Sequence, residues 1–133
     1  MMVDTHCHLT DEKLCGDIKG VLERARSAGV KRIIVPTTNL EDIRQAVGIV
    51  DRFKDVFMLV GVHPEHAEEA MDTEELVKTI GSSKKVVGVG EIGLDFHYDK
   101  EKKTKLKQVK LFKTQLKMAI EHKLPVAIHT REA

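Results

Sequence analysis

Short apolar runs alternate with longer amphipathic segments along the whole chain. The runs are rich in β-branched residues, and turn-favouring residues such as Pro36, Gly61 and Gly90 bound several of them. This pattern is typical of strands that are buried on both faces of a parallel sheet. The sequence therefore predicts five strands, at residues 3–8, 33–35, 56–60, 86–89 and 126–128.

Between these runs, apolar residues recur at the spacing of one helix face. Four helices are predicted: 18–28, a segment after the N-cap residue Asn39, a short segment after Asp72, and 101–122. The apolar face of the longest helix is expected to carry Leu106, Val109, Phe112, Leu116 and Ala119. Pro125 cannot continue a helix, so it marks the start of the last strand.

Strands and helices therefore alternate, as right-handed βαβ units require. Such a string suits either a doubly wound sheet or part of a (β/α)8 barrel. No Gly-x-Gly-x-x-Gly turn follows the first strand, which disfavours a dinucleotide-binding sheet and leaves a flavodoxin-like sheet open. No linker, repeat or shift in composition divides the chain, so we expect a single domain over residues 1–133.

The composition narrows the class of protein. Hydrophobic residues are 41% of the chain and charged residues 32%, which is typical of a folded globular domain. The net charge of +1 excludes a generally basic surface for nucleic acid. The longest apolar run, 56–62, is far shorter than the roughly 20 residues that span a bilayer, and no signal-peptide layout is present. Cys7 and Cys15 are too few for a disulfide framework, so we expect reduced thiols in a cytoplasmic protein that does not contact membranes.

Two histidines stand at the end of the first predicted strand, which reads Val-Asp-Thr-His-Cys-His. Because side chains alternate along a strand, His6 and His8 are expected on one face and Cys7 on the other. Two imidazoles about 7 Å apart on one strand can reach a common divalent metal ion. Cys7 is expected to pack under the helices rather than to bind the metal.

Other residues that can bind a metal follow the later strands. Glu91 closes an otherwise apolar strand, where a carboxylate is costly unless it is paired or bound to a cation. His129 closes the last strand in the same way, and His63 follows the third. In a barrel these strand ends converge on one mouth, where barrel enzymes place their chemistry. The sequence therefore predicts a metal site with four ligands: His6, His8, Glu91 and His129.

Four short segments stand out together: His-Cys-His at 6–8, Gly-Val-His-Pro at 61–64, Gly-Glu-Ile-Gly-Leu-Asp at 90–95 and His-Thr-Arg-Glu-Ala at 129–133. In order and spacing they resemble the signature segments of the TatD family of metal-dependent deoxyribonucleases. That family belongs to the amidohydrolase-like barrels, so the resemblance implies a barrel of the TIM type.

The resemblance also implies the reaction and a role for each residue. In the family, the histidines that match His6 and His8 hold one metal ion, and the histidine that matches His129 holds a second. The glutamate that matches Glu91 bridges the two ions, which makes Glu91 the expected catalytic residue. The histidine that matches His63 lies by the substrate phosphate. The implied activity is hydrolysis of phosphodiester bonds in DNA by metal-activated water, with two divalent ions that are Zn²⁺, Mn²⁺ or Mg²⁺.

The chain departs from the family in length. The family barrel has eight strands, whereas this sequence reaches the fifth, and the family's further histidine and aspartate ligands have no counterpart. The expected fold is thus a (β/α)8 TIM barrel truncated after the fifth strand, with about five parallel strands and four helices in one partial domain. We expect the isolated chain to be inactive or impaired, and to be either a homo-oligomer or a barrel that lacks its C-terminal half.

Two other functions stay open at this point. A related barrel with the same metal site could hydrolyse amides, lactones or other esters instead of DNA. A chain with half of a site could also be a non-catalytic module that binds metal weakly, or a half-barrel that assembles with a partner. The sequence leaves the true substrate, the identity of the metal and the reason for the missing strands undecided.

Overall fold

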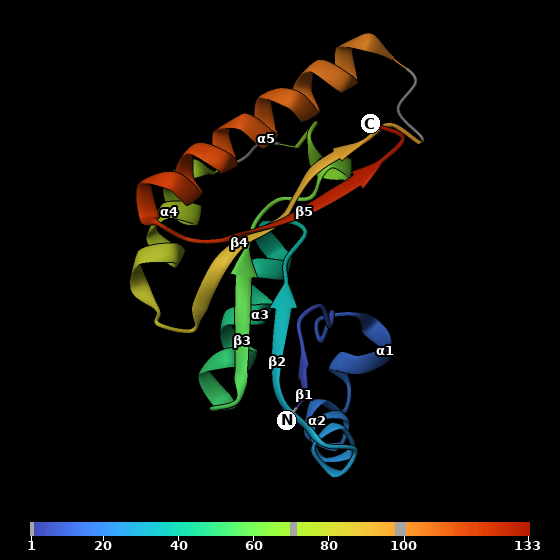
Figure 1. Ribbon diagram of the computed structural model, residues 1–133, viewed down its shortest axis with the longest axis vertical. Coiled ribbons are helices and arrows are strands. Elements are labelled where there is room, and N and C mark those ends of the chain that lie inside the picture. Colours follow the sequence, from blue (N-terminus) through green and yellow to red (C-terminus); the bar gives the residue numbers. More distant parts are fainter. Residues whose placement is uncertain (1, 70–71, 98–100) are drawn as a thin grey trace.

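A computed structural model describes residues 2–69, 72–97 and 101–133, and it shows five strands in one open parallel sheet (Figure 1). The strand order follows the chain: β1 (Met2–Asp4), β2 (Val30–Pro36), β3 (Val56–Val60), β4 (Val86–Asp95) and β5 (Val126–Arg131). A doubly wound sheet reverses its strand order at a switch point, whereas a barrel keeps it sequential. The prediction of five parallel strands in a truncated barrel is therefore confirmed.

Five α-helices and one 3₁₀ helix connect the strands in the described part of the chain. They are α1 (Glu12–Cys15), α2 (Ile18–Ser27), α3 (Leu40–Arg52), the 3₁₀ helix η1 (Pro64–His66), α4 (Thr73–Ser82) and α5 (Lys102–His122). Asn39 caps α3 with its side chain, as predicted, and Asp72 caps α4 in the same way. The prediction of four helices missed α1, because a helix of four residues is too short to show a periodic pattern. None of the helices in the described residues is long and apolar enough to span a bilayer.

The first strand is shorter than predicted and ends at Asp4 instead of residue 8. The carboxylate of Asp4 accepts a hydrogen bond from the backbone N–H of His6 at 3.1 Å. Such a local bond competes with the strand ladder, and it turns the chain out of the extended conformation. His6 and His8 therefore lie in the segment after β1. The prediction that they share one face of a strand was wrong. Cys7 is half-buried and packs against the hydrophobic core, as predicted.

The long helix α5 turns only part of the predicted face to the core: Ala119 is buried, and Phe112 and Leu116 pack against the core, as predicted. Leu106 is 60% exposed, and Val109 and Phe112 are only partly buried. The buried stripe contains two glutamines and three apolar residues: Gln108, Leu111, Gln115, Met118 and Ala119. The pattern of apolar residues misplaced this face because it treats every glutamine as a residue that faces solvent.

Each buried glutamine of α5 pairs with both backbone groups of one residue near a strand end. The side chain of Gln115 accepts from the N–H of Val62 at 2.7 Å and donates to its carbonyl at 2.9 Å. Gln108 does the same for Asp95, at 2.8 and 2.7 Å. Buried backbone groups need such partners, because an unpaired one costs free energy. The helix thereby fixes the ends of β3 and β4.

The two outer strands leave apolar side chains exposed. Met2 on β1 is 55% exposed, and Ile128 on β5 is 56% exposed, with Val3 and Val126 partly covered on the same strands. The inner strand β3 is instead covered along its length, with four of its five residues buried. The sheet is therefore closed in its middle and open at both edges.

We expect Gln115→Leu to lower the free energy of unfolding by about 2–4 kcal/mol. The substitution leaves the buried N–H and C=O of Val62 without a partner, and each such group costs about 1–3 kcal/mol. Urea denaturation followed by circular dichroism measures the change. Gln45→Leu on the exposed face of α3 is the matched control, with an expected change within about 0.5 kcal/mol. Equal effects of the two substitutions would contradict this role of Gln115.

Candidate metal centre

The five residues that the sequence singled out lie toward the carboxyl ends of the strands. His6 and His8 follow β1, and His63 follows β3. Glu91 and His129 lie within β4 and β5, because β4 continues to Asp95 and β5 to Arg131, beyond the predicted ends at 89 and 128. Parallel strands end at the same edge of a sheet, so these side chains come from distant parts of the chain to one place. This edge is the mouth that the barrel pattern predicted.

Glycines allow the strand ends that carry the site to approach each other. A Cβ on Gly61 would lie 2.8 Å from the backbone of Gly90, and one on Gly93 would overlap the carbonyl oxygen of His129. Gly90 and Gly93 both have a φ of +151°, which side chains with a Cβ rarely tolerate. The glycines of the Gly-Glu-Ile-Gly segment therefore let Glu91 lie between its neighbouring strands.

The first group of candidate ligands contains His6, His8 and Glu91. The Oε2 atom of Glu91 lies 3.3 Å from Nε2 of His6 and 3.7 Å from Nε2 of His8. The ring centroids of the two histidines are 5.0 Å apart. One donor atom from each residue lies within 4.8 Å of the others, which is close enough for one metal ion to contact all three.

The second group contains His63, His129 and the same Glu91, and its donor atoms also lie within 4.8 Å of one another. Here the other carboxylate oxygen of Glu91, Oε1, lies 2.9 Å from Nδ1 of His129. The rings of His63 and His129 meet edge to face, with centroids 4.3 Å apart. Glu91 thus belongs to both groups and turns one oxygen to each.

The chemistry of these donors fits two divalent ions. Imidazole and carboxylate ligands together suit Zn²⁺ and Mn²⁺, and a carboxylate that presents its two oxygens to separate groups of histidines can bridge two ions. The side chain of Glu91 is only 14% exposed, so a cation beside it would offset the cost of burying its charge. The structure brings His6, His8, Glu91 and His129 together, and their role as ligands stays a prediction.

His63 differs from the other histidines in its environment. It is buried, and its burial lowers the pKa of the imidazole, while the carboxylates of Glu65, Glu91 and Asp95 act in the opposite direction. Its Nδ1 atom accepts a hydrogen bond from the backbone N–H of Glu65 at 3.3 Å. In the neutral ring the proton is then on Nε2, which makes His63 a hydrogen-bond donor. A donor suits the predicted position by a substrate phosphate.

Asp95 and Arg131 had no predicted role, but the structure places both residues beside the two groups of candidate ligands. Burial raises the pKa of Asp95, but hydrogen bonds from Arg131, the backbone of His97 and His129 outweigh it and hold the pKa well below its usual value. Asp95 therefore stays ionised. The strand register pairs Asp95 with Arg131, so an acidic and a basic residue at matching ends of neighbouring strands was the signal available in the sequence.

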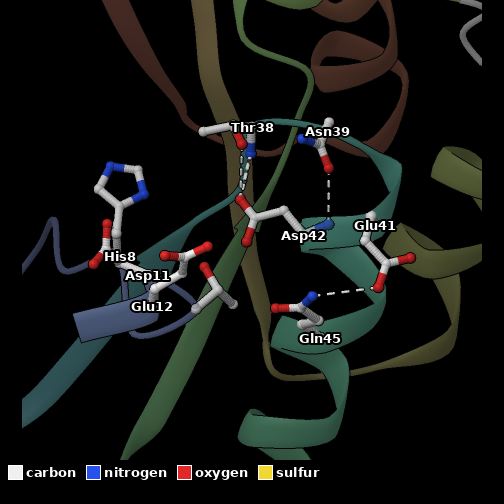
Figure 2. A pocket seen from close by; sticks show the side chains of 9 residues that line it. His8, Asp11, Glu12, Thr38, Asn39, Glu41, Asp42 and Gln45 are labelled. Carbon is white, nitrogen blue, oxygen red and sulfur yellow. Dashed lines mark hydrogen bonds between the residues drawn. The ribbon is translucent and has the colours of Figure 1, made fainter. Parts of the chain in front are cut away.

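A pocket of about 450 Å³ opens beside His8, between the loop that follows β1 and the start of α3 (Figure 2). Four carboxylates line it: Asp11, Glu12, Glu41 and Asp42. The carboxylate of Asp42 already accepts two hydrogen bonds, from the backbone N–H of Thr38 at 2.7 Å and from its hydroxyl at 3.0 Å (Figure 2). The pocket repels phosphate groups because its charged residues are all acidic.

Comparisons with known proteins agree with this geometry. The family model described as TatD related DNase matches residues 3–133. The uncharacterized metal-dependent hydrolase YabD of Bacillus subtilis is 37% identical to this chain. The alignment covers 100% of this chain and 52% of YabD. The 3'-5' ssDNA/RNA exonuclease TatD of Pantoea ananatis is 34% identical, with 99% of this chain and 51% of its own aligned.

Two solved structures share the fold. The crystal structure of YjjV, a TatD homolog from Escherichia coli, superposes with a TM-score of 0.89 at 35% identity, over 98% of this chain and 51% of that one. A TatD family hydrolase from Entamoeba histolytica gives 0.86 at 27% identity, over 98% and 50%. The chain thus spans about half the length of the relatives that it matches. Because the family model covers the chain almost from end to end, this protein belongs to the TatD-related family of metal-dependent hydrolases.

Proposed function

We propose that the protein hydrolyses phosphodiester bonds in DNA with two divalent metal ions. The observation that carries this proposal is the position of Glu91, which turns Oε2 to His6 and His8 and Oε1 to His129. When bound, two such ions lower the pKa of a water molecule and stabilise the charge on the attacking and leaving oxygens. Zn²⁺, Mn²⁺ and Mg²⁺ are the candidates.

The residues of this chain divide the work of holding the ions and the substrate. His6 and His8 would hold one ion with their imidazole nitrogens on one side of Glu91, and His129 would hold the other ion on the opposite side. Glu91 would supply negative charge to both. With its proton on Nε2, His63 can donate to a phosphate oxygen beside His129 instead of binding an ion.

The choice of DNA rests on the names of relatives, among which the TatD protein of Pantoea ananatis is called an ssDNA/RNA exonuclease. The chain has no general electrostatic attraction for a polyanion, because its 22 basic residues are balanced by 21 acidic ones. The acidic pocket beside His8 also repels phosphate. The scissile phosphate would therefore be held by the metal centre itself rather than by a basic groove.

We further propose that the open edges of the sheet are assembly surfaces. The exposed apolar residues Met2 and Ile128 lie on the two strands that have a free edge, β1 and β5. Free strand edges and apolar patches both favour pairing with another chain. For the 133-residue chain, the occupant that this chemistry favours is a second copy, since most soluble oligomers are cyclic dimers.

Glu91→Gln is expected to reduce the affinity for Mn²⁺ or Zn²⁺ by more than about 100-fold, as measured by isothermal titration calorimetry. Loss of a partner that only supports a ligand costs about 10–100-fold, and Glu91 belongs to both groups of ligands. Glu121→Gln, on an exposed carboxylate of α5 that pairs with Lys117 and belongs to neither group of candidate ligands, is the control and should leave the affinity unchanged. Unchanged binding by the Glu91 variant would rule out this metal centre.

The isolated chain is expected to cleave single-stranded DNA far more slowly than the ssDNA/RNA exonuclease TatD of Pantoea ananatis, because it holds only part of the family's ligand set. Both proteins are assayed with Mn²⁺ on the same labelled oligonucleotide and on a panel of carboxylic esters, lactones and amides. Rapid metal-dependent cleavage of DNA by the 133-residue chain, lost in Glu91→Ala, would contradict the expected impairment. Turnover confined to the panel would replace DNA as the substrate.

Sedimentation velocity is expected to show a dimer or larger assembly. Ile128→Lys places a charge on the exposed edge strand and should shift the population toward the monomer. Lys117→Glu, on the exposed face of α5, changes a charge away from both edges and serves as the control. A stable wild-type monomer of 15.0 kDa would show that the edges are not assembly surfaces.

A further inference from the structure

We propose that Asp95 orients His129 for metal binding, by keeping the imidazole proton on Nε2 so that Nδ1 is free to bind a cation. This inference rests on the proposed metal centre and adds a positioning residue to it. It starts from the place of His129, which lies between two carboxylates. Its Nδ1 atom is 2.9 Å from Oε1 of Glu91, and its Nε2 atom is 2.9 Å from Oδ2 of Asp95.

A neutral imidazole carries one proton, so it can donate to only one of these carboxylates. If the proton is on Nδ1, it lies between the ring and Glu91, where a metal ion would otherwise be. If the proton is on Nε2, the lone pair of Nδ1 points toward Glu91 and can join it in binding a cation. The choice between these two tautomers therefore decides whether His129 is a ligand.

Asp95 is held so firmly that its acceptor cannot turn away from His129. Its side chain is 6% exposed, and its Oδ1 accepts from Nε of Arg131 at 3.0 Å and from the backbone N–H of His97 at 3.1 Å. Nη2 of Arg131 lies 2.6 Å from Oδ2, the oxygen that also faces His129. The side chain of Gln108 on α5 binds the backbone N–H and C=O of Asp95 and so fixes its backbone as well.

The two carboxylates differ in what else they contact. Glu91 turns its second oxygen to His6 and His8, which places it among the other candidate ligands. Asp95 instead contacts Arg131, a cation that fixes the carboxylate in its ionised, acceptor-only form. Asp95 is thus the partner that takes the Nε2 proton, and a carboxylate in this place also raises the basicity of the ligating nitrogen.

The substitution Asp95→Asn tests this inference, because an amide has the same shape and can donate a hydrogen bond to Nε2. Two-bond ¹H–¹⁵N spectra of the ¹⁵N-histidine-labelled, metal-free chain at mildly alkaline pH report which nitrogen of His129 carries the proton; His129→Gln identifies the signal. The proton is expected on Nε2 in the wild type and on Nδ1 in the variant. Calorimetry is expected to show affinity for Zn²⁺ reduced about 10- to 100-fold in the variant.

Glu69→Gln is the matched control, since Glu69 also pairs with a histidine, His66 at 2.6 Å, outside both ligand groups. It should change neither the tautomer of His129 nor the affinity for Zn²⁺. A wild-type proton on Nδ1, or the same tautomer and affinity in Asp95→Asn as in the wild type, would overturn the inference. If Asp95→Asn does not fold, the wild-type spectrum alone decides. A wild type that binds no metal would defeat the proposed function, while the spectra would still decide the role of Asp95.

Discussion

The arrangement of the candidate site depends on one carboxylate, that of Glu91, which lies in an apolar strand and is contacted by histidines from two other parts of the chain. A buried negative charge must be compensated. The imidazoles around Glu91 offset the cost of burying its carboxylate, and the glycines leave room for it between the strands. Its two oxygens face in different directions. Glu91 therefore connects the two groups of candidate ligands, because one oxygen faces each group.

The rigidity of the site comes from the helix side of the sheet. Gln108 and Gln115 each bind both backbone groups of a residue at the mouth, and the residues they hold are Asp95 and the neighbour of His63. An amide that pairs with a peptide in this way replaces a missing strand neighbour. One helix therefore positions two strand ends at once, and with them the side chains of the candidate site.

Much of the fold was predictable from the sequence because alternation of apolar runs and amphipathic segments reports burial directly. The same is true of His6, His8, Glu91 and His129, which stand where parallel strands end. Two features were out of reach for physical reasons: the early end of β1, set by a side-chain hydrogen bond of Asp4, and the inward glutamines of α5. Each depends on a specific polar contact, which residue periodicity does not encode. The contact of Asp95 with Arg131 did leave a signal, an acidic and a basic residue at matching ends of neighbouring strands, but apolar periodicity does not use that signal.

The sequential strand order has a consequence for how the chain acquires its structure. Each strand pairs only with the strands that come before and after it in the sequence, so every pairing step closes a loop of one βα unit. The paired residues are 23 to 37 positions apart, so no pairing has to wait for a distant part of the chain. During synthesis, β1 to β4 can pair before β5 leaves the ribosome. Glu91 can thus be in place, with His6 and His8 beside it, while His129 is still inside the ribosome.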